Sequence, residues 1–276
     1  GIRDVERSRG LGDVYKRQQP AYPVKVLDKS LSILEILLRN NCAMSVTEIS
    51  EKLGIYPSAT HRMLDTLRYW GYVEQDPDTQ KYQLGLKVVE LGMAKLHQMD
   101  LVKEATFYLK ELVGKCNETV HLGVLEEGEV LYVAKEEPSQ TIRMVSQVGR
   151  RVPVHCTALG KILLAYLPKE ERKSILNRKG LPRLTENTIT DEIELEKELY
   201  KVREQGFALD RGEHERDVRC IAAPIRNYQG KVVAAISISG PAFRIDLTRQ
   251  NHLREALIHT GKKISVSYTH LTLPTN

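Results

Sequence analysis

The chain has 276 residues, of which 41 are Lys or Arg and 36 are Asp or Glu, so its formal net charge is only +5. This composition is typical of a soluble globular protein long enough for two domains, and it excludes the fibrous and disordered classes. The longest apolar runs, at residues 162–165 and 232–236, are far too short to cross a bilayer, so we expect no membrane partner.

The four cysteines lie far apart and form no CxxC pair, so neither a disulfide framework nor a zinc knuckle is expected. A reducing cytoplasm is the simplest location, and we expect no metal site and no cofactor. Residues 1–20 lack the apolar core of a signal peptide, which argues against export. We interpret residues 1–20 and 266–276 as non-native extensions and leave both out of the fold prediction.

Residues 24–85 begin with the pattern of three helices. A first helix is predicted over residues 27–39, and a short second helix over about 47–53. Thr47 is the expected N-cap of the second helix, and Gly54 supplies the left-handed residue that ends it. Pro57 suits the first turn of a third helix, which runs to about Trp70. The apolar residues expected to cover the inner face of the first helix are Leu27, Leu31, Ile33, Leu34, Leu37 and Leu38.

The predicted third helix has an apolar face and a polar face. Met63, Leu64 and Leu67 share one side, with Trp70 close by, and we expect this side to pack inward. The opposite side is free to meet a partner. The residues that recur on it at helical spacing are Ser58, His61, Arg62 and Asp65.

A hairpin is predicted directly after the third helix. Gly71 ends the helix, and residues 72–75 and 81–84 alternate like strands around the turn-rich segment 76–79. Three helices followed by such a hairpin predict a winged helix-turn-helix, a module that places its third helix in a DNA groove. An ordinary small helical subdomain with a hairpin is the alternative interpretation.

The predicted module carries little positive charge. Residues 24–85 contain seven Lys or Arg against eight Asp or Glu, so the basic surface typical of DNA binders is absent. Phosphate contacts supply much of the affinity of such proteins, and one copy of the module would therefore hold DNA weakly. We expect an oligomer that places two or more copies on a longer operator.

Residues 86–99 predict a linker helix, because their apolar side chains recur mostly at helical spacing. The second domain, residues 100–265, alternates helices with β-rich runs, which favours an α+β architecture with a mainly antiparallel sheet covered by helices. Helices are predicted over residues 101–115, 158–166 and 192–205, and strands over residues 118–125, 129–135, 220–226 and 231–239.

Several longer motifs narrow the interpretation. The first half contains HRMLDTLRYWGYV at residues 61–73, and the second half contains GRRVPVHCTALGK at residues 149–161. RCIAAP follows at residues 219–224 and AISISGP at residues 235–241. With these motifs the chain resembles the IclR family of bacterial transcriptional regulators, over about residues 24–264. Many regulators share a helix-turn-helix, but this combination of motifs is specific.

The resemblance implies a winged helix-turn-helix joined by a helix to a GAF-like effector-binding domain. It also implies a homodimer or homotetramer, double-stranded DNA as partner, and a small carboxylate effector such as a sugar acid or a keto acid. The predicted function is a DNA-binding transcriptional regulator whose affinity for a palindromic operator changes when the effector binds.

Seven residues match the effector-contacting positions of that family. The helix predicted to begin at Ala158 offers backbone N–H groups and its dipole to a carboxylate. Ser237 and Ser239 are two apart on a strand, so their hydroxyls point to the same side. An ionised Asp210 would repel a neighbouring carboxylate, so we expect it to accept hydrogen bonds from ligand hydroxyls or to be protonated. The seven residues are Ala158, Leu159, Gly160, Asp210, Cys220, Ser237 and Ser239.

Seven further residues are expected to contact DNA. Two positions depart from the family pattern, because Pro57 replaces a common lysine and Ala59 a common threonine. Some phosphate or base contacts are therefore expected to differ from those of relatives. The expected DNA-contacting residues are Thr47, Ser58, Ala59, His61, Arg62, Arg68 and Lys81.

Two other functions and a metal site remain as alternatives. An enzyme could use Cys220 as nucleophile and His214 as base, but no nucleophile turn with an oxyanion site is present, so we expect no enzyme. An adaptor that uses the winged helix to dock a protein would leave no DNA footprint. Zinc ligand types occur at His155 and Cys156, with His214 and Asp210 elsewhere, but no ligand spacing organises them.

Overall fold

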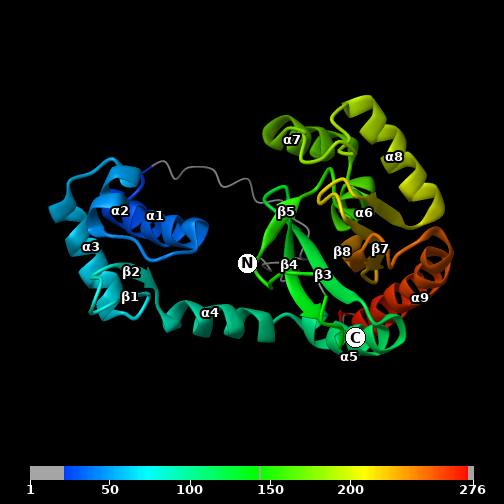
Figure 1. The fold of residues 1–276 in the computed structure, drawn as a ribbon, viewed down its shortest axis with the longest axis horizontal. Helices are drawn as coiled ribbons and strands as arrows, with labels where there is room; N and C mark the ends of the chain where they lie inside the picture. The colour runs from blue at the N-terminus through cyan, green and yellow to red at the C-terminus, as the bar shows by residue number, and fades with distance from the viewer. Residues whose placement is uncertain (1–21, 143, 273–276) are drawn as a thin grey trace, which may run out of the picture. The chain divides into compact units, whose positions relative to one another are not determined.

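A computed structural model describes residues 22–142 and 144–272 of the chain (Figure 1). The chain divides into two units, and the first consists of helices and a short hairpin. The boundary between the units falls between Gln98 and Met99. The predicted non-native extension at residues 1–20 lies outside the described residues, as do residues 273–276 of the predicted tail.

The N-terminal unit has the predicted winged helix-turn-helix fold. Strands β1 and β2 pair antiparallel, with Val73 opposite Leu84. Leu64 of the third helix and Tyr82 of the hairpin are fully buried together with Ile33 and Ile49, so all parts of the unit share one core. Its elements are α1 (Lys25–Asn40), α2 (Val46–Leu53), α3 (Pro57–Tyr69), β1 (Val73–Gln75), β2 (Tyr82–Leu84) and α4 (Leu86–His97).

The predicted N-cap of the second helix was wrong by two residues. Ser45, not Thr47, caps α2, because Ser45 lies three residues before an acidic side chain that can complete a capping box. The Glu48 N–H donates to Ser45 Oγ (3.3 Å), and the Ser45 N–H donates to Glu48 Oε2 (2.7 Å). Thr47 lies exposed in the first turn of the helix.

Two parts of the predicted core are exposed instead. On α1 only Ile33 and Leu37 are buried, whereas Leu27, Leu31 and Leu38 are each more than half exposed. Trp70 is 63% exposed, because it lies six residues beyond Leu64, about 240° around the helix and therefore turned away from the core. The amphipathic stripe of α1 is thus narrower in the monomer than its sequence suggests.

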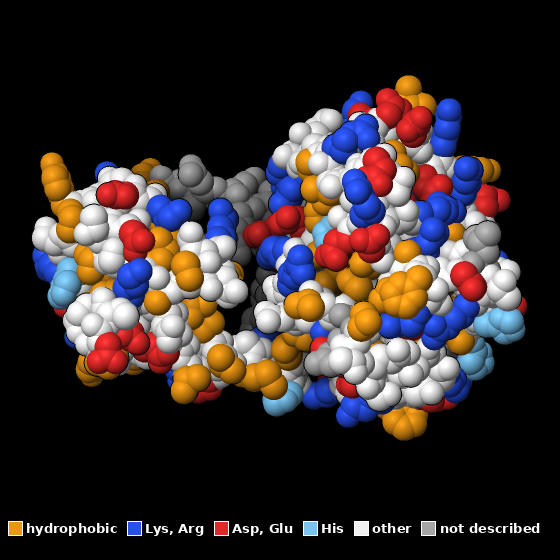
Figure 2. Space-filling model, in the orientation of Figure 1, with side chains coloured by type: hydrophobic (Ala, Val, Ile, Leu, Met, Phe, Trp, Pro, Cys, Tyr) orange, Lys and Arg blue, Asp and Glu red, His pale blue; other side chains and the backbone are white. Residues whose placement is uncertain are grey.

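Helix α4 confirms a helical segment after the hairpin but has no buried residue. Hydrophobic side chains are exposed along it, as Figure 2 shows. In the part of the chain that the structure describes, no helix is both long enough and apolar enough to span a bilayer. The exposed apolar residues of α4 are Leu86, Val89, Leu91 and Met93.

The C-terminal unit has the predicted α+β architecture. Its six strands form one antiparallel sheet in the order β5-β4-β3-β8-β7-β6. The strands are β3 (Thr119–Glu126), β4 (Glu129–Glu136), β5 (Arg151–Pro153), β6 (Ala208–Arg211), β7 (Val218–Arg226) and β8 (Val232–Pro241). The helices are α5 (Asp100–Cys116), α6 (Ala158–Ala165), α7 (Lys169–Lys179), α8 (Glu192–Gln205) and α9 (Leu247–Thr272).

Helices lie on both sides of this sheet (Figure 1). Helices α5 and α9 pack against each other and against strands of the sheet, and α6 packs between the sheet and α8. Every residue of α6 is buried, which agrees with its sequence ALGKILLA, apolar except for one lysine. The first residues of this helix form one wall of a cavity.

Four elements of this unit were not predicted, namely β5, β6, α7 and α9. Helix α9 continues through residues 266–272, which the sequence analysis had left out of the fold. Tyr268 is buried, and the Ser267 hydroxyl donates to Glu104 of α5, so this segment packs on the unit. That residues 266–276 are non-native stays a prediction.

The capping box of α2 gives a stability prediction. Replacing Ser45 with Ala removes the side-chain acceptor for the Glu48 N–H and should lower the unfolding free energy of the N-terminal unit by about 1 kcal/mol. Trp70 is the single tryptophan and lies in this unit, so its fluorescence during urea unfolding reports on it. Thr47→Ala is the matched control and should change little; equal losses for both variants would contradict the assignment of the cap.

Candidate functional site

A cavity lies between the sheet of the C-terminal unit and the first residues of α6. The space between the protein atoms there is about 470 Å³, a volume that includes open solvent at the mouth. Six of the seven residues predicted to contact an effector line this cavity, and Gly160 does not. The six are Ala158, Leu159, Asp210, Cys220, Ser237 and Ser239.

The N-terminus of α6 points two free backbone donors at the cavity. Thr157 is the N-cap, and its Oγ1 accepts the Gly160 N–H (3.2 Å). The first N–H groups of a helix have no carbonyl partner, so those of Ala158 and Leu159 are left for a ligand. Gly160 serves packing instead, because a Cβ there would lie 2.3 Å from the Val154 carbonyl oxygen.

The sheet supplies the opposite wall through residues in register. Asp210 on β6 lies opposite Cys220 on β7, and Cys220 lies opposite Ser239 on β8. Ser237 lies opposite His121 on β3. Residues directly opposite each other point to the same face of a sheet. Asp210, Cys220 and Ser239 therefore form one row across three strands, and Ser237 and His121 lie in the adjacent row on the same face of the sheet.

Asp210 is the acidic end of this row. Its side chain is only 2% exposed, and its Oδ1 accepts the Glu213 N–H (2.7 Å). Burial raises the pKa of the Asp210 carboxyl to about 7, because the low-dielectric interior disfavours the charged form. Both protonation states of Asp210 are therefore available near neutral pH.

Among the cavity residues that the sequence analysis did not predict, His121, Tyr132 and Ser146 form a group. His121 Nε2 lies 2.7 Å from Ser146 Oγ, its Nδ1 lies 3.5 Å from Ser239 Oγ, and its ring stacks on Tyr132 at 4.7 Å. Burial lowers the pKa of His121 to about 3, so the imidazole is neutral and can either donate or accept. A histidine inside an otherwise apolar strand was the signal that could have identified it.

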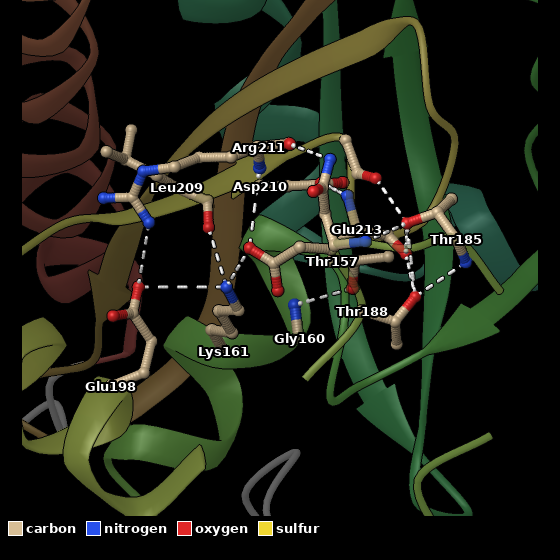
Figure 3. A network of polar contacts seen from close by, with 12 residues as sticks. Thr157, Gly160, Lys161, Thr185, Thr188, Glu198, Leu209, Asp210, Arg211 and Glu213 are labelled. Carbon is tan, nitrogen blue, oxygen red and sulfur yellow. Dashed lines mark hydrogen bonds and ion pairs between the residues drawn. The ribbon is translucent and has the colours of Figure 1, made fainter. Parts of the chain in front are cut away.

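A buried ion pair near Asp210 joins α6 to the segment that follows β6 (Figure 3). Lys161 of α6 is completely buried, and its Nζ donates to Glu213 Oε1 (2.5 Å) and to the Leu209 carbonyl (3.0 Å). Glu198 Oε1 lies 3.8 Å from the same nitrogen. Burial raises the pKa of Glu213, although Lys161 acts in the opposite direction. Lys161 thus ties α6 to β6, the strand that carries Asp210.

The N-terminal unit presents a second candidate surface, the polar face of α3. Ser58, His61, Arg62 and Arg68 are exposed. Asp65 binds two of them, since its oxygens lie 3.0 Å from His61 Nδ1 and 3.0 Å from Arg68 Nη2. Among the other residues expected to contact DNA, Thr47 is exposed, and Ala59 and Lys81 are half-buried.

Arg68 also links α3 to the hairpin. Its Nη1 donates to Gln75 Oε1 (2.7 Å), and Gln75 Nε2 donates to Gln80 at the turn. These contacts are all exposed, so each contributes at most about 1 kcal/mol, and a phosphate group can replace them at small cost. The face is therefore polar, accessible and adjustable.

Two family models cover most of the chain. The model of the bacterial transcriptional regulator IclR C-terminal domain matches residues 93–266, and that of the IclR helix-turn-helix domain matches residues 26–77. The chain belongs to the IclR family. It is therefore a transcriptional regulator with a DNA-binding helix-turn-helix, and the resemblance seen in the sequence motifs is confirmed.

Individual members of the IclR family are similar along most of their length. The chain is 40% identical to the regulator KdgR of Escherichia coli (strain K12) over 225 residues, which cover 80% of this chain and 84% of KdgR. It is 35% identical to XynR of the same organism over 242 residues, 88% of this chain and 96% of XynR. A solved IclR homologue from Microbacterium hydrocarbonoxydans, complexed with 4-hydroxybenzoate, superposes with a TM-score of 0.78 at 27% identity, covering 88% and 98% of the two chains.

Membership in the IclR family, whose members are regulators, argues against the enzyme hypothesis, and the cavity gives a physical reason as well. Burial raises the pKa of the Cys220 thiol well above its ordinary value, so its reactive thiolate form is suppressed. Burial also lowers the pKa of His214. Cys220 is therefore a neutral polar lining residue of the cavity.

The residue types considered for zinc do not assemble into a site. His155 Nε2 lies 3.1 Å from the Pro182 carbonyl oxygen, and burial raises the pKa of Cys156 to about 12. Within residues 22–142 and 144–272, no three His, Cys, Asp or Glu side chains are grouped so that they could hold a metal ion.

The raised pKa of Asp210 makes stability depend on pH. The folded state keeps the proton up to about pH 7, whereas the unfolded chain loses it near pH 3.8, so stability falls as the pH rises through this interval. Asp210→Asn removes this dependence. Relative to the unchanged protein, the variant should gain about 3 kcal/mol between pH 5 and pH 8.

Urea unfolding followed by far-ultraviolet circular dichroism at the two pH values measures this difference. Glu170→Gln makes the same carboxyl-to-amide change at an exposed position of α7 and should show no such gain. A stability difference between Asp210→Asn and the unchanged protein that is the same at pH 5 and pH 8 would disprove the buried-carboxyl account.

Proposed function

We propose that this regulator binds a small organic acid in the cavity of its C-terminal unit and that binding changes its affinity for a DNA operator. The main support for this proposal is the pair of free N–H groups at Ala158 and Leu159, which face a polar row that ends in Asp210. A carboxylate suits the helix N-terminus, where both the dipole and the donors favour an anion.

The far end of the cavity selects for hydroxyl or keto groups. Ser237, Ser239, the neutral His121 and Asp210 offer donors and acceptors on one face of the sheet, which a plain fatty acid could not satisfy. A sugar acid or a keto acid fits this arrangement. The similar protein from Microbacterium hydrocarbonoxydans was solved with 4-hydroxybenzoate, a ligand with a carboxylate at one end and a hydroxyl at the other.

We further propose that the regulator acts as a homodimer or homotetramer on a palindromic operator. The nearly neutral winged helix-turn-helix needs a second copy to hold DNA firmly. The exposed apolar side chains of α1 and α4 are suited to contacts between copies. Two recognition helices then meet half-sites about 34 Å apart, and an effector that alters their spacing alters affinity.

The carboxylate site can be tested by removing one donor. Proline is tolerated at the first position of a helix, and Thr157 already has the extended backbone that a following proline requires (φ −109°, ψ 146°). Ala158→Pro therefore deletes one N–H at the cavity while α6 persists. Loss of a hydrogen bond to a charged group should weaken acid binding about tenfold or more.

Calorimetric titration with 4-hydroxybenzoate, gluconate and pyruvate provides the measurement. Ala158→Gly keeps the N–H and should bind an acid that the unchanged protein binds with similar affinity. If the proline and glycine variants bind that acid equally well, the carboxylate does not sit at the helix N-terminus.

The DNA contact can be tested at Arg62, which is exposed on α3. Arg62→Ala should weaken operator binding about tenfold and reduce the slope of log affinity against log salt by about one, because one phosphate contact is lost. Fluorescence anisotropy with a duplex selected by the protein from a random pool measures both quantities. Lys173→Ala on α7 removes the same charge from the other unit and should have no effect. An unchanged affinity and salt slope for Arg62→Ala would show that Arg62 makes no phosphate contact.

A further inference from the structure

Asp210 presents an electrostatic problem in the proposed site. Its carboxyl lines the same cavity as the free N–H groups of Ala158 and Leu159, where the proposed function places a second carboxylate. Two ionised carboxylates in one buried cavity repel each other strongly, because the low dielectric does not screen them. Either a cation must lie between them, or one of the two must carry a proton.

The cation nearest to Asp210 is already engaged. Lys161 approaches Asp210 from α6, but its Nζ is held by Glu213 Oε1 at 2.5 Å and the Leu209 carbonyl at 3.0 Å, with Glu198 Oε1 at 3.8 Å. Figure 3 shows the ammonium group enclosed by these acceptors. With acids on two sides, Lys161 does not provide a spare positive charge for the cavity.

The other titratable groups around Asp210 offer no charge compensation. From its own turn, Glu213 disfavours a second negative charge, and His214 is kept neutral because burial lowers its pKa. From β7 the neutral Cys220 thiol faces Asp210 across the strand pair. Arg150 also lines the cavity and acts on Tyr132 and His214, but it is exposed to solvent and is not among the groups that shift the pKa of Asp210. The remaining groups that sense the Asp210 charge are the neutral Tyr132 of β4 and the neutral Cys156 before α6. Glu215 also lines the cavity, but as an acid it supplies no positive charge.

Backbone contacts show how Asp210 can be held in place without its charge. Its Oδ1 accepts the Glu213 N–H at 2.7 Å, a hydrogen bond that a neutral carboxylic acid also accepts. The hydroxyl of the protonated acid can then donate to the ligand, which an ionised carboxylate cannot do.

We propose, on the basis of the proposed function, that Asp210 carries a proton when the cavity is occupied and donates a hydrogen bond to the anionic effector. Where Asp210 is ionised in the empty cavity, it takes this proton from solvent as the acid anion binds. The site then takes up no net charge, and it favours ligands that present a carboxylate, keto or hydroxyl oxygen to Asp210.

The coupling fixes how affinity depends on pH. The pKa of Asp210 is about 7 in the empty cavity. At pH 6 the Asp210 carboxyl is therefore mostly protonated, and at pH 8 it is ionised in most of the protein molecules. The affinity for the acid anion should be constant at and below pH 6 and should fall by nearly tenfold per pH unit above pH 7. The regulator is then less sensitive to its effector in an alkaline cell.

Calorimetry in two buffers tests the proposal directly. The protein is titrated at pH 6 and pH 8 with 4-hydroxybenzoate, gluconate and pyruvate, in phosphate and in Tris, whose ionisation enthalpies differ. The difference in heat between the buffers gives the number of protons taken up. For an acid that binds, we expect nearly one proton at pH 8 and only a small fraction of one at pH 6.

Asp210→Asn and Glu170→Gln are the matched carboxyl-to-amide variants. Asp210→Asn should bind the acid with no proton uptake and with the same affinity at both pH values, whereas Glu170→Gln should behave like the unchanged protein. Proton uptake that persists in Asp210→Asn would assign the proton to another group, such as Glu213, and would overturn the proposal.

The titrations distinguish a loss of proton coupling from the absence of an acid site. An acid that binds the unchanged protein equally well at pH 6 and pH 8, with no buffer dependence, overturns proton coupling and leaves the effector site intact. If none of the three acids binds even at pH 6, where no repulsion from Asp210 remains, the proposed acid site fails and proton coupling fails with it.

Discussion

The buried Lys161 ammonium group donates hydrogen bonds to the Leu209 carbonyl of β6 and to Glu213 in the turn after β6. These hydrogen bonds set the position of α6 relative to β6 in the C-terminal unit. An ammonium group without partners costs several kcal/mol to bury, so α6 can occupy its place only when Glu213 and the Leu209 carbonyl surround that nitrogen. Ala158 lies less than one helical turn before Lys161, and Asp210 directly follows Leu209. The same contacts therefore fix the separation between the helix N-terminus and the Asp210 carboxyl, the two ends of the proposed ligand site.

The two units use charge in opposite ways. In the C-terminal unit Lys161, Glu213 and Asp210 are buried and held by short hydrogen bonds, which gives a rigid site with shifted pKa values. On α3 the ion pairs of Asp65 with His61 and Arg68 are exposed and weak, so they can be exchanged for phosphate groups. A rigid sensing site and an adjustable DNA surface suit a protein in which a small ligand controls DNA binding.

The sequence predicted most of the fold because hydrophobic period and turn residues are local signals. Leu64 and the hairpin around residues 76–79 predicted the winged helix-turn-helix, and the alternation at Ser237 and Ser239 predicted that both point to one face of the sheet. Helix α7 was missed because its sequence KEERKSILNRK is mostly polar, and β5 and β6 because they have only three and four residues. Leu253, Leu257 and Ile264 of α9 recur at helical spacing, a signal that was present but not used.

The parts of the site that were missed depend on contacts between distant segments. Lys161 meets Glu213 across 52 residues, and His121 meets Ser239 across 118, so neither environment can be deduced from local pattern. Likewise, Leu27 and Leu31 were predicted to be buried because an apolar stripe does not distinguish the core of one chain from a surface that meets another copy.

The central claim, that an acid in the cavity controls DNA binding, is tested most directly by operator affinity at saturating ligand. Anisotropy titrations at fixed salt and pH 6, with and without an acid shown to bind the protein, measure the coupling between the two sites. The account predicts a change in operator affinity of about fivefold or more, and no change in a variant that cannot bind the acid. An operator affinity that is identical with the cavity empty and with it filled would contradict the account.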